Sequence, residues 1–305
     1  MAIICFDIGG SFIKGAVALT ARDITPLAPQ PTPLEDFEAF AATLIGVIAD
    51  SNIRPERIAI SITGIIDPET GIATVANIPC IHGRTLRRDL EALLGLDVLI
   101  ANDADCFALA EAGLGAGRGH AIVLGAILGS GVGGGLVADG RLVNASGGFA
   151  GEWGHGPILP NHAGDPPVAI PAWECACGQT RCLNTVGGAR GMERLHVEVH
   201  GVERTSREIV DGWQAGEAAA TRTIDLYVEL VASPLALAVN ITGASIVPVG
   251  GGLAKSGPLM EKLDGAVRAR TLRKFGRPLV VPGTLSIEPG LAGAAILGLG
   301  YAHAV

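Results

Sequence analysis

The sequence predicts a protein built from two α/β domains, and three observations lead to this fold class. The chain has 305 residues, which is more than one ordinary hydrophobic core usually serves. A pattern of strand, glycine-rich turn and strand occurs near the N-terminus and returns at residues 121–143. Segments with apolar residues at helical spacing follow each of these hairpins. Strands that alternate with helices are typical of α/β domains.

The first domain is expected over residues 1–117. It opens with an apolar strand at residues 3–6, which leads through the turn "DIGGS" into a second strand within "FIKGAVALT". Three apolar segments and a short helical pattern complete the domain. They are an amphipathic helix at 35–51, buried strands at 58–62 and 98–101, and a helix at about 104–112.

The second domain is expected over residues 118–289, after the small and flexible segment "GLGAGRG" at 113–119. It repeats the opening pattern, with a strand, the turn "GSGVGGG" and a return strand. A Pro-rich loop at 156–171, helical patterns over 206–240 and another buried strand within "ASIVPVGGGLA" follow. The C-terminal segment 290–305 is predicted to form a helix that packs back on the first domain.

Composition excludes several classes of function. Hydrophobic residues make up 49% of the chain and charged residues 17%, as in globular proteins. The net charge of −8 argues against a nucleic-acid partner. The longest apolar run, at 121–137, is interrupted by glycines, so no membrane span is expected. The N-terminus has no basic region before its apolar residues, so we expect no signal peptide and a cytoplasmic location.

The two glycine-rich turns, one in each half, suggest two backbone cradles for one polyphosphate. Glycine lets the main chain approach an anion closely, and free N–H groups then bind its oxygens. Asp7 precedes the first turn and could hold Mg²⁺ through water molecules. Most isolated glycine turns only close hairpins, which is the structural alternative. The turns do not fit the P-loop pattern.

Asn102 and Asp103 stand where a predicted strand ends and a helix begins. Asp103 could be the N-cap of that helix, a role that aspartate fills well. It could instead be a carboxylate base at a cleft, placed to take a proton from a hydroxyl group. Spacing alone leaves both interpretations open.

Three of the six cysteines lie in "ECACGQTRC" at residues 174–182. Cys175 and Cys177 are too close for an ordinary disulfide, and their spacing is not that of a redox pair. With Cys182 and His155 they would form a closed Cys₃His zinc site, which is structural rather than catalytic. His162 is a rival for the fourth position, and an unligated cluster is the remaining alternative. The other three cysteines, Cys5, Cys80 and Cys106, are predicted to be small core residues.

Together these motifs resemble those of the repressor/open-reading-frame/kinase (ROK) family of sugar kinases. The matching segments are, in order, "FDIGGS", "ANDADCFALAEA", "LGSGVGGGLVADGRL", "GGFAGEWGHGP" and "CACGQTRC". The resemblance covers essentially the whole chain and is strongest to bacterial N-acetylglucosamine kinases. It implies the two-domain actin-like ATPase or hexokinase fold (ribonuclease H-like), two α/β domains that close over ATP and a sugar.

The resemblance also implies roles for individual residues. Those implied for ATP lie in three turns: Asp7, Gly9, Gly10 and Ser11; Gly129, Ser130, Gly131 and Gly133; Gly250, Gly251 and Gly252. Those implied for the sugar are Gly64, Asn77, Asn102, Asp103, Glu152, His155 and Asn184, with Asp103 as the catalytic base. The implied zinc ligands are His155, Cys175, Cys177 and Cys182. ATP, catalytic Mg²⁺ and structural Zn²⁺ are the expected cofactors, and a homodimer is expected because dimers are typical of the family.

The expected reaction is ATP-dependent phosphorylation of the 6-hydroxyl of N-acetyl-D-glucosamine. Another hexose is the alternative, namely glucose, fructose or N-acetylmannosamine. A sugar-responsive regulator is disfavoured, because the repressors of the family carry an added N-terminal helix-turn-helix domain, whereas here the phosphate hairpin starts at Ile3 and the charge is acidic. Two departures from the family pattern stand out. Arg181 and Asn184 replace the family's Gly and Glu, which puts the sugar preference in question, and the first turn reads Gly-Gly-Ser instead of Gly-Gly-Thr.

Overall fold

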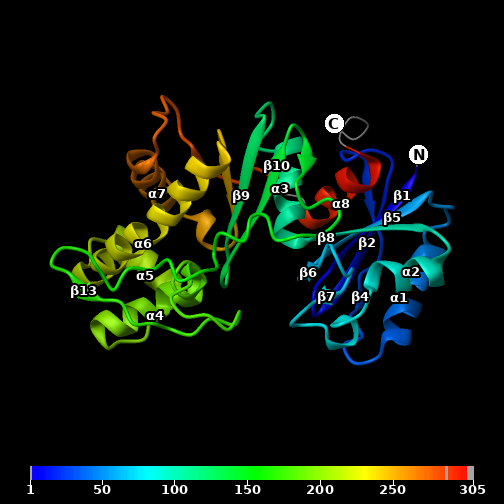
Figure 1. Ribbon diagram of the computed structural model, residues 1–305, viewed down its shortest axis with the longest axis horizontal. Coiled ribbons are helices and arrows are strands. Elements are labelled where there is room, and N and C mark those ends of the chain that lie inside the picture. The colour runs from blue at the N-terminus through cyan, green and yellow to red at the C-terminus, as the bar shows by residue number, and fades with distance from the viewer. Residues whose placement is uncertain (1, 286–287, 301–305) are drawn as a thin grey trace. The chain divides into compact units, whose positions relative to one another are not determined.

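The computed structural model describes residues 2–285 and 288–300, which form two compact units. Unit 1 comprises Met1–Gly119, Gly135–Ala150 and Thr284–Val305, and unit 2 comprises His120–Gly134 and Gly151–Gly283. Each unit contains helices and a β-sheet, so the α/β class is confirmed (Figure 1). The domain boundary expected between residues 117 and 118 stays a prediction.

The sheet of unit 1 has the strand order β3-β2-β1-β5-β8, and β4 also pairs with β2. The strands are β1 (Ile3–Ile8), β2 (Phe12–Ala18), β3 (Ile24–Pro26), β4 (Gln30–Pro31), β5 (Arg57–Ile62) and β8 (Asp97–Asn102). β1 and β2 form the predicted antiparallel hairpin, whereas β1, β5 and β8 run parallel. Parallel strands end at the same edge of the sheet, so the residues that follow β1, β5 and β8 come close together.

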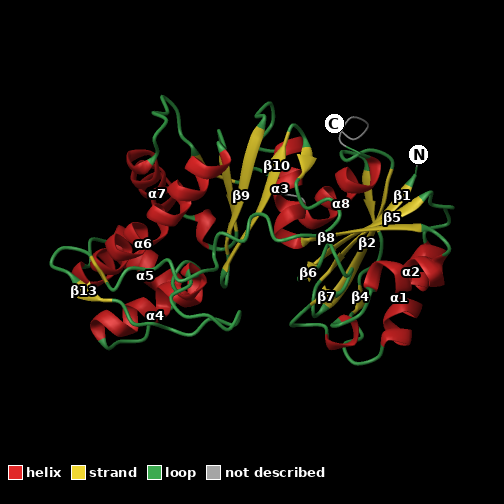
Figure 2. Ribbon diagram, in the orientation of Figure 1, coloured by secondary structure: helices red, strands yellow, loops and turns green. Residues whose placement is uncertain are grey.

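Helices cover both faces of this sheet (Figure 2). They are α1 (Phe37–Asp50), α2 (Leu86–Leu94), α3 (Asp103–Gly113) and α8 (Pro289–Leu299). Phe40 and Leu44 of α1 pack in one core with Phe6 and Ile60, as the predicted apolar stripe requires. On the opposite face α8 contacts β1, β5 and α3. Short elements complete the unit: η1 (Pro79–Ile81), β6 (Ile65–Ile66), β7 (Ala73–Thr74) and β11 (Arg141–Leu142).

The predicted C-terminal helix at 290–305 corresponds to α8 in part. Its small side chains allow a close approach, because Gly293 lies directly against the backbone of Cys106 in α3. The helix ends at Leu299, and Gly300 follows with a positive φ of 77°. Residues 301–305 lie outside the described part of the chain.

The second sheet has the order β11-β10-β9-β14-β15. Its remaining strands are β9 (Ile122–Leu128), β10 (Val132–Ala138), β14 (Val247–Gly250) and β15 (Val280–Pro282). Four helices belong to unit 2: α4 (Ala189–His200), α5 (Ser206–Gln214), α6 (Ala218–Thr242) and α7 (Gly257–Arg270). The shorter elements are β12 (His162–Ala163), β13 (Val168–Ala169), η2 (Leu183–Thr185) and η3 (Leu253–Lys255). The helical patterns expected at 206–240 correspond to α5 and α6.

Helix α6 is long and apolar enough to cross a membrane by length and composition, although no span was expected from the sequence. More than half of its most apolar window, 56%, is buried inside the protein, and the helix contains Pro234. It packs against α4, α5 and α7. These contacts are those of a core helix in a globular unit, and such helices pass the same composition test.

Candidate active site and metal cluster

Asp7 lies on the face of the first sheet that α8 covers. Side chains alternate along a strand, so Asp7 shares this face with Ile3. Gly290 in the first turn of α8 is in close contact with the Asp7 carboxylate, and Ile3 contacts the other end of the same helix at Gly298. The parallel register places Ser61 of β5 beside Asp7, and its hydroxyl donates a hydrogen bond of 2.9 Å to Asp7 Oδ1. Strand alternation thus aims a predicted phosphate-site carboxylate at a helix N-terminus, where negative charge is stabilised.

Desolvation raises the pKa of the Asp7 carboxyl, and this effect is stronger than the lowering by the Ser61 hydroxyl and the Lys14 ammonium. The Glu288 carboxylate raises the pKa further, although Lys14 neutralises part of that charge across a 2.7 Å ion pair. Because the pKa is higher in the folded protein than in the unfolded chain, ionised Asp7 destabilises the fold. A loss of folding stability of this kind is common at functional sites, where a carboxylate serves a purpose such as binding a cation.

We expect Asp7→Asn to raise the unfolding temperature at neutral pH. The amide keeps an acceptor for Ser61 but removes a partly buried charge. The difference should vanish as the pH falls below the carboxyl pKa of the unfolded chain, because both proteins are then uncharged at residue 7. Differential scanning fluorimetry over about pH 3 to 8 tests this. Asp67→Asn is the matched control with the opposite sign, since the Thr70 N–H lowers the pKa of Asp67. A lower unfolding temperature for Asp7→Asn at neutral pH would contradict the prediction.

The first glycine turn is held closed by its own backbone and by a residue that the sequence did not single out. The Gly9 N–H donates to the carbonyl of Phe12 at 3.1 Å. Thr32 donates its hydroxyl to the Gly9 carbonyl at 2.7 Å and its N–H to the Ser11 carbonyl at 3.1 Å. Asn77 lies against Gly10, where an added Cβ would come within 3.2 Å of its carbonyl oxygen. The first turn and Asn77, expected at phosphate and sugar, are therefore neighbours in unit 1.

Asp103 follows β8 directly and is the first residue of α3. The cap of α3 is Asn102, whose Oδ1 accepts the Ala104 N–H at 2.8 Å and whose Nδ2 donates to the Gly64 carbonyl at 2.8 Å. The capping role that the sequence left open for Asp103 is thus filled by its neighbour. Asp103 accepts the same Ala104 N–H at 2.9 Å, and Thr63, just after β5, donates to it at 3.4 Å.

Asp103 remains exposed to solvent as a residue, yet the protein around its carboxyl raises the pKa by desolvation. The Ala104 N–H opposes this shift, and the negative charge of Asp7 adds to it. A higher pKa makes the carboxylate a better proton acceptor. Asp103 therefore combines access to a ligand with the basicity that a general base needs.

The second glycine turn connects β9 to β10 in unit 2. The Gly129 N–H closes it on the Gly131 carbonyl at 3.0 Å. Gly251 lies against Leu128 and Gly129, because β14 runs parallel to β9 and ends beside it. The predicted second phosphate turn and the 250–252 segment are thereby adjacent. Trp153 donates its Nε1–H to the Gly133 carbonyl at 2.9 Å, which ties the turn to the segment that leads to His155.

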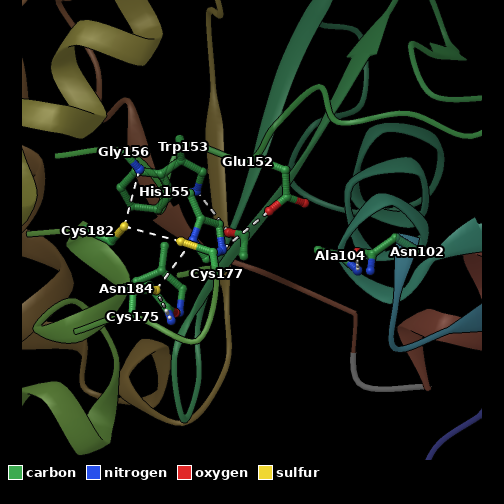
Figure 3. A network of polar contacts seen from close by, with 12 residues as sticks. Asn102, Ala104, Glu152, Trp153, His155, Gly156, Cys175, Cys177, Cys182 and Asn184 are labelled. Carbon is green, nitrogen blue, oxygen red and sulfur yellow. Dashed lines mark hydrogen bonds and ion pairs between the residues drawn. The ribbon is translucent and has the colours of Figure 1, made fainter. Parts of the chain in front are cut away.

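The four predicted metal ligands lie together in unit 2 (Figure 3). Their ligand atoms all lie within 4.8 Å of one another. Cys177 Sγ is 3.6 Å from Cys182 Sγ, and Cys175 Sγ is 3.6 Å from His155 Nδ1. A tetrahedral zinc ion with ordinary bond lengths separates its ligands by about 3.5–3.8 Å, whereas a disulfide requires about 2.05 Å. The two 3.6 Å distances are compatible with a bound zinc ion, and no disulfide joins the three cysteines in the structure.

The chemistry of the donors also suits a cation. The Gln179 N–H is the main cause that lowers the pKa of Cys177 to about 6, whereas burial raises the pKa of Cys182 to about 11. A bound metal would keep the buried Cys182 as a thiolate. The second ring nitrogen of His155, Nε2, lies 3.7 Å from Glu152 Oε2, the carboxylate–histidine arrangement that is common behind metal ligands. His162, the rival ligand, lies on β12 and is outside the cluster.

Some residues that shape these sites escaped the sequence reasoning. Ser61, Thr32 and Trp153 act through hydrogen bonds that depend on strand register or loop packing. Trp153 stands inside the motif "GGFAGEWGHGP", so its position was a usable signal. The Gly187-Gly188 pair before α4 was a second usable signal, because adjacent glycines often mark a close approach of two backbones. The chain there does pass close to the second glycine turn, and the Ala189 N–H donates to the Gly129 carbonyl at 2.7 Å.

Comparison with known proteins identifies similar chains over the full length. The sequence model of the ROK family matches residues 3–300. The N-acetyl-D-glucosamine kinase of Pasteurella multocida (strain Pm70) is 34% identical over 302 residues, covering 96% of this chain and 98% of the relative. The N-acetylgalactosamine kinase AgaK of Shewanella sp. (strain ANA-3) is 33% identical and covers 96% of each chain. The crystal structure of the ROK hexokinase from Thermus thermophilus superposes with a TM-score of 0.83 at 30% identity, covering 97% of each chain.

Proposed function

Because this chain belongs to the ROK family, we propose that it transfers the γ-phosphoryl group of ATP to the 6-hydroxyl of N-acetyl-D-glucosamine. The observation that carries the proposal is the group of acidic and hydroxyl side chains at the carboxyl ends of β1, β5 and β8. Asp7, Thr63 and Asp103 stand there in unit 1, at the edge where α/β sheets bind ligands. The relatives supply the substrate class.

In the proposed reaction the 6-hydroxyl oxygen forms a bond to the γ-phosphorus of ATP while the bond to the ADP oxygen breaks. The hydroxyl proton passes to Asp103, whose raised pKa suits it to accept that proton. Catalysis of this kind rests mainly on positioning and on charge neutralisation. The glycine turns at residues 9–11 and 129–133 would bind phosphate oxygens through backbone N–H groups.

Two metals belong to the proposal. Asp7 is the residue that would hold magnesium, whose charge neutralises the phosphates when it is bound. His155 and the three clustered cysteines would hold a structural zinc ion, which their spacing supports. A homodimer in the cytoplasm is part of the same proposal. Exposed Leu237, Ile241 and Leu272 in unit 2 are available for contact with a second copy.

The sugar is tested by coupled ADP release over a panel of hexoses. We expect the highest kcat/KM with N-acetyl-D-glucosamine, and N-acetylgalactosamine is the first competitor because of the 33% identical relative. N-acetylmannosamine, glucose and fructose complete the panel. A higher kcat/KM with another hexose would change the substrate but keep the kinase. Absence of sugar-dependent ADP release with all five sugars would refute the proposed function.

A further inference from the structure

Asn184 occupies a position between the cysteine cluster and the second glycine turn. It belongs to the short helix η2, two residues after Cys182, and its backbone N–H donates to the Gly154 carbonyl at 2.8 Å. Its side-chain Oδ1 accepts the N–H of Val132, the first residue of β10, at 2.8 Å. Its Nδ2 lies 3.6 Å from Cys175 Sγ and donates to it. Both ends of the amide are therefore engaged within unit 2, and Figure 3 shows Asn184 beside Cys175.

These two contacts need the chemistry of asparagine. The oxygen must accept from a backbone N–H while the nitrogen donates to sulfur, and an amide offers both functions on one planar group. Glutamate, which the family resemblance leads us to expect here, is longer and has no donor when ionised. A hydrogen bond to the sulfur of a metal ligand helps to orient that ligand, as groups behind metal ligands commonly do.

The Asn184 side chain lies directly against the second glycine turn. A Cβ added at Gly131 would come within 2.5 Å of Asn184 Oδ1, so the amide is seated directly on the turn. Two hydrogen bonds connect the turn to the 184–189 segment. Asn184 Oδ1 accepts the N–H of Val132, and the Ala189 N–H donates to the Gly129 carbonyl. Within residues 2–285 and 288–300, the N–H groups of Ser130 and Gly131 donate no hydrogen bond. The turn is thus fixed at both ends while its central N–H groups remain available to an anion.

We infer that Asn184 is a positioning residue that joins the cysteine cluster to the second glycine turn and so governs ATP affinity rather than sugar choice. The part of the inference that concerns ATP rests on the proposed kinase function. The part that concerns the cluster does not, because it follows from the Nδ2–Sγ contact alone. This role differs from the sugar contact that the family resemblance implies for this position.

Asn184→Ala removes both contacts. Metal should leave the substrate-free protein about 10-fold faster or more, measured with a chelating dye, because partners of metal ligands typically change affinity 10–100-fold. KM for ATP should rise about 10-fold, as expected when a backbone N–H loses its acceptor. ADP binding without sugar, measured by calorimetry, should weaken by the same factor. KM for the sugar should stay within about twofold.

Asn184→Asp separates the two contacts, since its carboxylate can still accept from Val132 but cannot donate to Cys175. It should release metal as fast as Asn184→Ala. Asn161→Ala is the matched control, because Asn161 is an exposed asparagine of the same unit and outside the cluster. It should match the wild type in every measurement.

A change in sugar KM or in sugar preference, with ATP affinity unchanged, would overturn the inference and assign Asn184 to the sugar. Wild-type metal release in both Asn184 variants would show that the residue does not support the cluster. If the wild type phosphorylates no sugar, the proposed function fails on its own, and the metal-release and ADP-binding comparisons still test the inference.

Discussion

Asp103→Asn should lower kcat by roughly two to four orders of magnitude, the contribution typical of a general base. The amide cannot accept the hydroxyl proton at the moment when the sugar oxygen attacks. The local structure should survive, because Asn102 caps α3 and an asparagine at position 103 can still accept the Ala104 N–H. Sugar binding is therefore expected to change little. Steady-state kinetics and a direct sugar-binding titration measure the two effects separately.

The control for this variant lies on the same strand. Asp97→Asn changes an exposed aspartate at the opposite end of β8, and its kinetics should equal those of the wild type. Near-normal turnover of Asp103→Asn would remove Asp103 from the mechanism. Loss of turnover together with loss of sugar affinity would point to a binding role instead.

The pH dependence gives a second view of Asp103. A base must be ionised to act, so kcat/KM should fall as the pH decreases through its pKa. Because desolvation raises that pKa, the loss should begin at a higher pH than for an ordinary aspartate. The residual activity of Asp103→Asn should lack this acidic limb. An identical limb in the variant would assign the titration to another group, such as Asp7.

Removal of the metal should have the second large effect. The wild type should contain about one zinc per chain by elemental analysis, and Cys182→Ala should contain none. Cys182 is fully buried, and its sulfur also accepts the Gly156 N–H at 3.4 Å. Structural zinc sites contribute folding energy directly. We therefore expect a large fall in unfolding temperature. Activity should fall at least about 10²-fold, because the second glycine turn is no longer held in place once the cluster is lost.

Limited proteolysis locates the damage. Arg181 lies inside the cysteine segment with a φ of 61°, and its Nη1 is held at 3.4 Å by the carbonyls of Pro160 and Ile170. Trypsin should cleave after Arg181 once a chelator has removed the metal, and added zinc should restore protection. Cys80→Ala, which changes a half-buried cysteine outside the cluster, is the control and should keep its zinc. A native protein without metal, or with a disulfide among these cysteines, would contradict this prediction.

Local sequence was sufficient wherever a property depends on neighbours along the chain. The β1–β2 hairpin, the stripe of α1 and the start of α3 near Asp103 follow from strand, turn and helix patterns of a few residues. The cysteine cluster followed from the spacing of Cys175, Cys177 and Cys182. Family membership followed from motifs in order along the chain, and the matched family model confirms it. Helices α2, α4 and α7 were not predicted; their sequences contain a smaller share of apolar residues than that of α1.

Tertiary structure decided the properties that depend on residues far apart in the sequence. It selected His155 over His162, since only His155 is brought to the cysteines by the turn from Glu152. It gave Asn102 the capping role that the sequence had left open for Asp103. It set the pKa shift of Asp7 through burial beside Ser61, 54 residues away. It turned Asn184 toward Val132 and Cys175, where sequence alone suggested a sugar contact. Desolvation and hydrogen bonding act over a few ångströms of space, and the distance between two residues in space is fixed by strand register and packing rather than by their separation along the chain.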